Sequence, residues 1–179
     1  MDLKRIKIKV QGSIIKALAI AIEAEKTGLI NYLNFAYQTK DETGKNMFLR
    51  LAMDEFDHMR LLEQQQQNLA QTECFSAVTI EPSLIEKLVP QLSAKDLRIR
   101  GKQGIQELDA LKTALALEDQ AINFYKEQAQ NSSDSNAKAM FERLVAMEKA
   151  HYELLQAEID AIEKTGYWFN LREFSLEIE

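Results

Sequence analysis

Apolar residues recur every three or four positions along four stretches of this 179-residue chain. This spacing is typical of amphipathic helices, because residues three and four apart share one face of a helix. The four stretches cover residues 14–38, 43–70, 105–130 and 136–164. Short polar turns join the first to the second and the third to the fourth. The pattern therefore predicts an all-α fold of two helical hairpins, over residues 13–70 and 106–165.

The two ends of the chain depart from this pattern. Residues 1–12 alternate apolar and polar positions in part, so a tail or a short strand is expected there, with Ser13 as the N-cap of the first helix. Gly166 is a typical residue for ending the fourth helix. Residues 166–179 are rich in aromatic side chains. We expect this tail to pack on the bundle or on a second subunit.

The segment between the hairpins, residues 71–105, also breaks the helical pattern. It contains both prolines of the chain, Pro82 and Pro90. Short helices are expected over residues 83–88 and near 93–99, since a helix tends to stop before a proline. We therefore predict that the whole segment is a long crossover connection between the second and third helices.

Composition narrows the class of protein. Hydrophobic residues make up 46% of the chain and charged residues 28%, which is ordinary for one globular domain over residues 1–179. The net charge of −6 argues against nucleic-acid binding, which needs a basic excess. The single cysteine, Cys74, allows no internal disulfide and favours a cytoplasmic location. The apolar stretches are interrupted by charges and too short to cross a membrane.

The two hairpins repeat one another without a gap at an offset of 93 residues. Met47 and Phe48 return as Met140 and Phe141, and many other positions match in the same way. An ungapped match over two helices and a turn indicates internal duplication. We therefore expect a bundle with approximate two-fold symmetry.

The repeat contains the candidate chemistry. The chain has two histidines, His58 and His151, and each stands three residues after a glutamate, Glu55 or Glu148. Residues three apart lie on one face of a helix, so each pair offers a carboxylate and an imidazole in one direction. A lone pair of this kind also fits an ion pair on a helix surface, and its duplication favours a metal site.

Spacing about the turns predicts where these groups meet. Glu25 and Glu55 are 30 residues apart around the first turn, and Glu118 and Glu148 are 30 apart around the second. Fifteen residues of helix span roughly 22 Å, so all four carboxylates should lie deep in the bundle at one height, together with the histidines. Buried carboxylates need compensating charge, and two divalent cations would supply it. Oxygen-rich ligation with one imidazole per metal favours iron or manganese over structural zinc.

At these residues the chain resembles the rubrerythrin group of the ferritin-like superfamily. The resemblance covers roughly residues 13–165 and rests on four segments: AIEAEKTGLINY, LAMDEFDHMRLL, ALALEDQAINFY and VAMEKAHYELL. It implies a ferritin-like four-helix bundle that binds two iron ions, with manganese or mixed metals as alternatives. It also implies a homodimer.

The resemblance implies a role for each site residue. Terminal metal ligands would be Glu25 and Glu118, bridging ligands Glu55 and Glu148, and capping ligands His58 and His151. Tyr32 and Tyr125 would hydrogen-bond to ligand carboxylates. Either tyrosine could instead be a core residue whose hydroxyl reaches a backbone carbonyl. Asp54 could orient His151 across the bundle or face solvent, since Met147 occupies the matching position of the repeat.

The function implied by the resemblance is reduction of hydrogen peroxide in defence against oxidative stress, by a non-haem di-iron oxidoreductase. Dioxygen is the alternative oxidant. The alternatives are a ferroxidase or iron-handling protein, and a metal-bound bundle with a structural or interaction role.

Two departures from the family pattern bear on the choice between these functions. Ala121 stands where rubrerythrins usually carry a further glutamate, with Gly28 as its repeat mate, and Cys74 alone cannot form a rubredoxin-type module. Electrons would therefore come from a separate donor, such as a rubredoxin-type protein.

Overall fold

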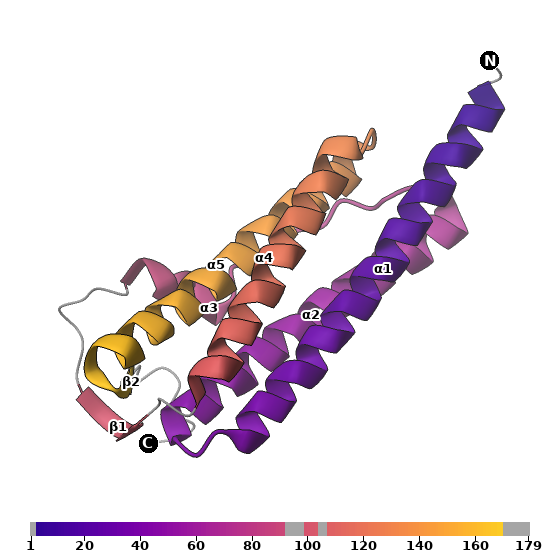
Figure 1. Cartoon of the computed structure of the whole chain (residues 1–179). Coiled ribbons are helices and arrows are strands. Elements are labelled where there is room, and N and C mark those ends of the chain that lie inside the picture. Colours follow the sequence, from indigo (N-terminus) through magenta and orange to yellow (C-terminus); the bar gives the residue numbers. More distant parts are fainter. Residues whose placement is uncertain (1–2, 92–98, 104–106, 170–179) are drawn as a thin grey trace.

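The computed structural model describes residues 3–91, 99–103 and 107–169, with side chains over 14–90 and 107–168. In this part of the chain, long helices form a bundle of two antiparallel hairpins (Figure 1). The long helices are α1 (Leu3–Gln38), α2 (Glu42–Thr72), α4 (Leu108–Asn131) and α5 (Ser135–Thr165). The predicted all-α bundle, with its long crossover between the hairpins, is confirmed. Among the described residues, no helix combines the length and apolarity needed to cross a membrane.

The duplication is visible in how the helices begin and end. The carboxylate of Asp41 accepts hydrogen bonds from the backbone N–H groups of two residues in the first turn of α2, at 2.9 and 3.2 Å. Asp134 does the same for α5, at 2.9 and 3.0 Å. The helices end at Glu73 and Gly166, whose φ angles of 58° and 80° are left-handed. All four positions match at the repeat offset, so both hairpins are capped in the same way.

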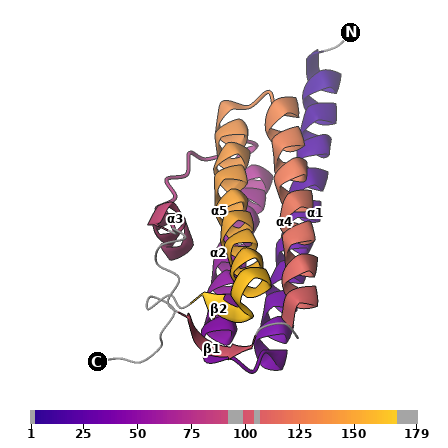
Figure 2. The same cartoon turned by 60° about the vertical axis from the view of Figure 1, so that its left-hand side comes forward.

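Helix α1 begins earlier than the sequence pattern predicted. The expected tail or strand over residues 1–12 is wrong for residues 3–12, which are helical, and Ser13 therefore lies inside α1 instead of capping it. Residues 1–2 lie outside the described residues. The physical reason is that extending an existing helix adds one backbone hydrogen bond per residue. Gly12 opposes this by only about 1 kcal/mol. Figures 1 and 2 show the start of α1 projecting past the other helices.

The crossover is tied to the side of α5 by the short helix α3 (Leu84–Leu88), which was predicted. Ser83 and Glu86 form a capping box at the start of α3. The hydroxyl of Ser83 accepts a hydrogen bond from the backbone N–H of Glu86, and the carboxylate of Glu86 accepts one from the backbone N–H of Ser83. The carboxylate of Glu86 also pairs with the guanidinium of Arg143 on α5. Figure 2 shows α3 beside α5, where these contacts hold it.

The rest of the crossover differs from expectation. A 3-10 turn, η1 (Val89–Gln91), follows α3 and includes Pro90. The helix predicted near 93–99 is wrong at Ile99, where the strand β1 (Ile99–Gln103) begins, and residues 92–98 lie outside the described part. Short irregular segments carry too little periodicity to separate a helix from a strand.

The aromatic tail begins with a strand, β2 (Tyr167–Phe169), that pairs with β1 in an antiparallel ribbon. Within β2, Trp168 is buried and meets the ring of Phe48 edge-on, with centroids 6.0 Å apart. Its indole also covers Gly44, where an added Cβ would lie 2.6 Å from the ring. The described start of the tail therefore packs on the bundle, which was one of the two arrangements expected for it. Residues 170–179 lie outside the described residues.

The core has two apolar clusters with a polar layer between them. On α2, Leu51 belongs to one cluster and Leu62 to the other, and the buried Glu55 and His58 lie between them along the helix. The other long helices follow the same plan. The polar layer is therefore shielded from solvent along the bundle axis on both sides.

Candidate metal centre

All six residues predicted as metal ligands meet in this polar layer. Each of the four long helices contributes one glutamate, and α2 and α5 each add a histidine three residues further on. Their exposed fractions are all 4% or less: Glu25, Glu55, His58, Glu118, Glu148 and His151. The i,i+3 spacing places the glutamate and histidine of each helix on the same inward face, as expected.

Two glutamates bridge between the histidines. Glu55 places Oε2 3.6 Å from Nδ1 of His58 and Oε1 3.3 Å from Nδ1 of His151. Glu148 places Oε1 3.1 Å from Nδ1 of His58 and Oε2 3.2 Å from Nδ1 of His151. Each carboxylate thus offers one oxygen to either side of the centre, as the bridging role requires.

The remaining two glutamates each serve one side. Oε2 of Glu25 lies 3.2 Å from Nδ1 of His58, and Oε1 of Glu118 lies 3.7 Å from Nδ1 of His151. The imidazole rings stack with centroids 5.4 Å apart and an interplanar angle of 14°. Two sets of ligand atoms result, each within 4.8 Å of one another, and they share the two bridging glutamates. The contacts thus divide the six residues into two glutamates shared by both sides, one further glutamate on each side and one histidine on each side.

The two tyrosines connect the hairpins at this level. The hydroxyl of Tyr32, on α1, donates a hydrogen bond to Oε1 of Glu118 on α4. The hydroxyl of Tyr125, on α4, donates to Oε1 of Glu25 on α1. Both tyrosines are buried. Of the two expectations for these residues, the structure therefore shows the contact with site carboxylates, and each tyrosine holds the glutamate of the other hairpin.

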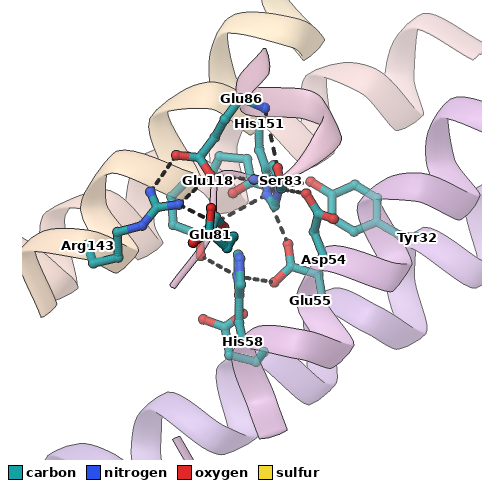
Figure 3. A network of polar contacts seen from close by, with 12 residues as sticks. Tyr32, Asp54, Glu55, His58, Glu81, Ser83, Glu86, Glu118, Arg143 and His151 are labelled. Carbon is teal, nitrogen blue, oxygen red and sulfur yellow. Dashed lines mark hydrogen bonds and ion pairs between the residues drawn. The ribbon is translucent and has the colours of Figure 1, made fainter. Parts of the chain in front are cut away.

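The two halves of the centre differ behind the histidines. Nε2 of His151 lies 3.2 Å from Oδ2 of Asp54, as Figure 3 shows from close by. Nε2 of His58 is buried and has no hydrogen-bond partner among the described residues. Met147 stands where a symmetric partner of Asp54 would be. The sequence left open whether Asp54 faces solvent or His151, and the structure places it on His151.

Burial and mutual repulsion dominate the electrostatics of the terminal glutamates. Burial raises the pKa of Glu25 well above its ordinary value, and the charges of Glu55 and Glu148 raise it further. The pKa of Glu118 is raised by the same causes. Because an uncompensated carboxylate is costly in this environment, the protonated form of both groups is favoured when no cation is bound.

The bridging glutamates behave in the opposite way. Burial acts to raise the pKa of Glu55, but close contacts with Glu25 and both histidines outweigh it and lower the pKa. The pKa of Glu148 is also lowered, because contacts with His58 and His151 outweigh burial and the charge of Glu55.

The pKa values of the two histidines are raised by the surrounding carboxylates. Burial acts to lower the pKa of His58, but the charge of Glu148 and contacts with Glu25 and Glu55 raise it well above its ordinary value. The pKa of His151 is raised in the same way, with Asp54 among its partners. Without metal, these shifts favour the imidazolium form of both histidines, beside the carboxylates of Glu55 and Glu148. Two divalent cations would balance four carboxylates beside two neutral imidazoles, so metal binding exchanges protons for cations.

The donor atoms fit a pair of metal ions. Both carboxylate oxygens of Glu148 and Nδ1 of His151 are buried without a hydrogen-bond partner among the described residues, although they converge on the same space. Buried polar atoms normally have partners, and a coordinated cation would supply one. The set is rich in carboxylate oxygens and has one imidazole on each side, which suits iron or manganese. The described residues can therefore hold a di-metal centre.

Sequence reasoning missed a pocket of about 550 Å³ between α1 and α4 that ends on the site carboxylates. Gly28 and Ala121 line it, each one helical turn after a terminal glutamate. In the sequence these two positions were interpreted only as the absence of a further glutamate ligand. Their small size, repeated in both hairpins, was also the available indication that space is left beside the metal centre.

Comparison with known proteins gives one match. A model of the rubrerythrin family matches residues 16–159, which is most of the chain and includes all six site residues. No curated protein and no solved structure matches the chain.

Proposed function

Because the chain belongs to the rubrerythrin family, we propose that it reduces hydrogen peroxide at two iron ions held by the four glutamates and two histidines. One structural observation supports this proposal most strongly. Glu55 and Glu148 each direct one oxygen to the side of His58 and the other to the side of His151. Carboxylates placed in this way would hold two ions next to each other, where both could act on one substrate molecule. Bound ferrous ions would supply the two electrons of the reduction.

The protein's own contribution is to fix the ligands and limit access of water. Tyr32 and Tyr125 hold Glu118 and Glu25 by hydrogen bonds, so the terminal carboxylates keep one orientation. The apolar clusters on both sides of the polar layer exclude water along the bundle axis. Access is left through the pocket between α1 and α4. Shielding from water along the bundle axis strengthens the electrostatic interactions inside the site.

The tyrosines also keep protons close to the reacting groups. Reduction of hydrogen peroxide to two water molecules consumes two electrons and two protons. Burial raises the pKa of Tyr32 and Tyr125, and the nearby carboxylates raise it further, so both hydroxyls stay protonated. We assign the proton-holding atoms beside the substrate to Oη of these two residues, both of which line the pocket.

Electrons, assembly and location are part of the proposal. The 179 residues contain one cysteine, whereas a rubredoxin-type iron site needs several thiolates, so we propose a separate electron donor of that type. We propose a homodimer, which is supported by the exposed Met53 and Phe56 in the apolar groove between α1 and α2. We propose a cytoplasmic location, in keeping with the lone exposed Cys74.

Rapid mixing of the anaerobic ferrous protein with either hydrogen peroxide or dioxygen tests the proposal. Oxidation by peroxide should be the faster reaction at equal concentrations, with one peroxide consumed for two ferrous ions. Faster oxidation by dioxygen would instead support a ferroxidase. A ferrous protein that peroxide leaves unchanged would overturn the proposed function.

A further inference from the structure

The pocket between α1 and α4 is much larger than hydrogen peroxide requires. Its volume is about 550 Å³, within the range of pockets that bind whole organic ligands. The substrate of the proposed reaction has two heavy atoms. Figure 2 shows α1 and α4 side by side. Residues of both helices line the pocket. The extra space points to a substrate with a larger body.

The walls and the floor of the pocket have opposite character. The walls are formed mostly by apolar or small residues: Ile20, Ala24, Gly28, Leu117, Ala121 and Phe124. The polar residues Glu23, Thr27, Asn31 and Gln120 also line the pocket. The floor is formed by the site glutamates and the two tyrosines. An apolar ligand gains about 25 cal/mol for each Å² of its surface that leaves water, so the walls favour a hydrocarbon body. The polar floor would meet the reactive end of the same molecule.

Two small residues keep the space open above the bridging glutamate. A Cβ added at Gly28 would lie 3.4 Å from Cδ of Glu55, in van der Waals contact with its carboxyl group. A longer side chain there would fill the space beside that carboxylate. Ala121 lines the same pocket from α4, at the matching position of the repeat. The pocket is thus kept open from both helices.

Charge restricts the kind of organic molecule that fits. Glu23 lies at the pocket lining and is not one of the site ligands, and the chain has a net charge of −6. An anionic ligand would be repelled on approach and would lose its hydration on entry. A neutral molecule carries neither cost.

We propose that this pocket admits neutral organic hydroperoxides, with the hydrocarbon group between α1 and α4 and the peroxide group at the floor. The proposal rests on the peroxide-reducing function proposed above. The O–O bond is cleaved, one alcohol and one water are formed, and two protons are taken up. The two electrons come from the two ferrous ions, each of which is oxidised to the ferric state and is later reduced by the donor protein.

The first test measures binding without turnover. Cumyl alcohol, the product of cumene hydroperoxide, is titrated into the oxidised iron-loaded protein by calorimetry. We expect binding to the wild type and at least tenfold weaker binding to Ala121→Leu, which fills the pocket. Ala24→Leu fills it from α1 and should weaken binding even if Ala121→Leu fails to fold. Ala116→Leu, on the exposed face of α4, is the matched control and should bind like the wild type. Equal binding to all four proteins, or none to the wild type, would overturn the proposal.

The second test separates this inference from the proposed function. The ferrous protein is mixed with hydrogen peroxide, neutral cumene hydroperoxide, or a hydroperoxide that carries a carboxylate. We expect oxidation by the first two, a slower reaction with the anionic one, and loss of the cumene hydroperoxide reaction alone in Ala121→Leu. Oxidation by hydrogen peroxide only would overturn the inference and leave the proposed function standing. No oxidation by any peroxide would overturn both.

Discussion

Asp54 on α2 places Oδ2 3.2 Å from Nε2 of His151 on α5, and this contact makes the two halves of the centre unequal. It connects the two hairpins and leaves Nδ1 of His151 directed at the site carboxylates. A carboxylate behind a metal-binding histidine fixes its tautomer and raises its basicity. His58 has Met147 at the corresponding position, so we expect the duplicated sequence to give two metal positions of different strength.

Removal of this carboxylate should weaken one metal position more than the other. For Asp54→Ala we expect a loss of about 10- to 100-fold in affinity for one of two bound divalent ions, the one beside His151. Titration of the metal-free protein with Co²⁺, followed by absorption, resolves the two steps. Asp160→Ala changes an exposed aspartate of α5 and serves as the control. If Asp54→Ala titrates like the wild type, the contact with Asp54 does not tune the metal position.

The crossed tyrosine contacts should contribute to stability in equal measure. In Tyr32→Phe the carboxyl of Glu118 loses its hydrogen-bond donor while it stays buried, which costs about 1–3 kcal/mol in the free energy of unfolding. Tyr125→Phe should have a similar effect through Glu25. Tyr37→Phe is the matched control, because Tyr37 is 89% exposed and should change nothing. Urea denaturation of the metal-free proteins measures all three, and a destabilised Tyr37→Phe would show that the effect is not specific to the site.

The metal-free protein should lose stability as the pH rises. In the unfolded chain the histidines titrate near 6.5, whereas the pKa values of His58 and His151 are raised by folding. Above pH 6.5 the folded state therefore binds more protons than the unfolded state, and the stabilisation is lost as the pH rises through the folded pKa values. Glu25 and Glu118, with pKa values raised above 4.5, act in the same direction.

Thermal unfolding between about pH 7 and pH 9 checks this linkage. We expect the melting temperature of the metal-free protein to fall over this range. The metal-loaded protein should show no such fall, because binding of cations has already displaced these protons. A melting temperature of the metal-free protein that is constant or rises with pH would contradict the raised pKa values described for the cluster.

Gly44 should tolerate no side chain because of Trp168. A Cβ at Gly44 would lie 2.6 Å from Cε2 of the indole, so Gly44→Ala should cost about 1–3 kcal/mol in the free energy of unfolding. Ala137 holds the matching position of the repeat and is buried, which shows that the fold itself accepts a methyl group there. The double variant Gly44→Ala/Trp168→Ala should lose less free energy of unfolding than the two single variants lose when their losses are summed. Full additivity, measured by urea denaturation, would contradict the close contact.

The sequence was sufficient to predict the parts of this structure that are periodic or duplicated. Glu25 and Glu118 could be located because helical spacing and equal distance from a turn fix both the face and the height of a residue. The direction of the Asp54 side chain could not be predicted, because a small rotation of α2 moves it between solvent and His151. The pairing of Ile99 with Phe169 joins residues far apart in the sequence, and neither segment has enough residues to show a strand pattern. The pocket depends on the separation of α1 and α4, which no local pattern records.

Anaerobic titration of the metal-free protein with ferrous ion tests the central claim most directly. The bridging geometry predicts two ferrous ions per chain in the wild type, and loss of at least one in Glu148→Gln, which removes a carboxylate shared by both positions. Gln65→Glu is the control. It places at a buried position of α2 the residue type that the repeat mate Glu158 has, leaves the six ligands intact, and should still bind two ferrous ions. Binding of fewer than two ferrous ions by the wild type, or of two by Glu148→Gln with unchanged affinity, would contradict a di-metal centre bridged by Glu55 and Glu148.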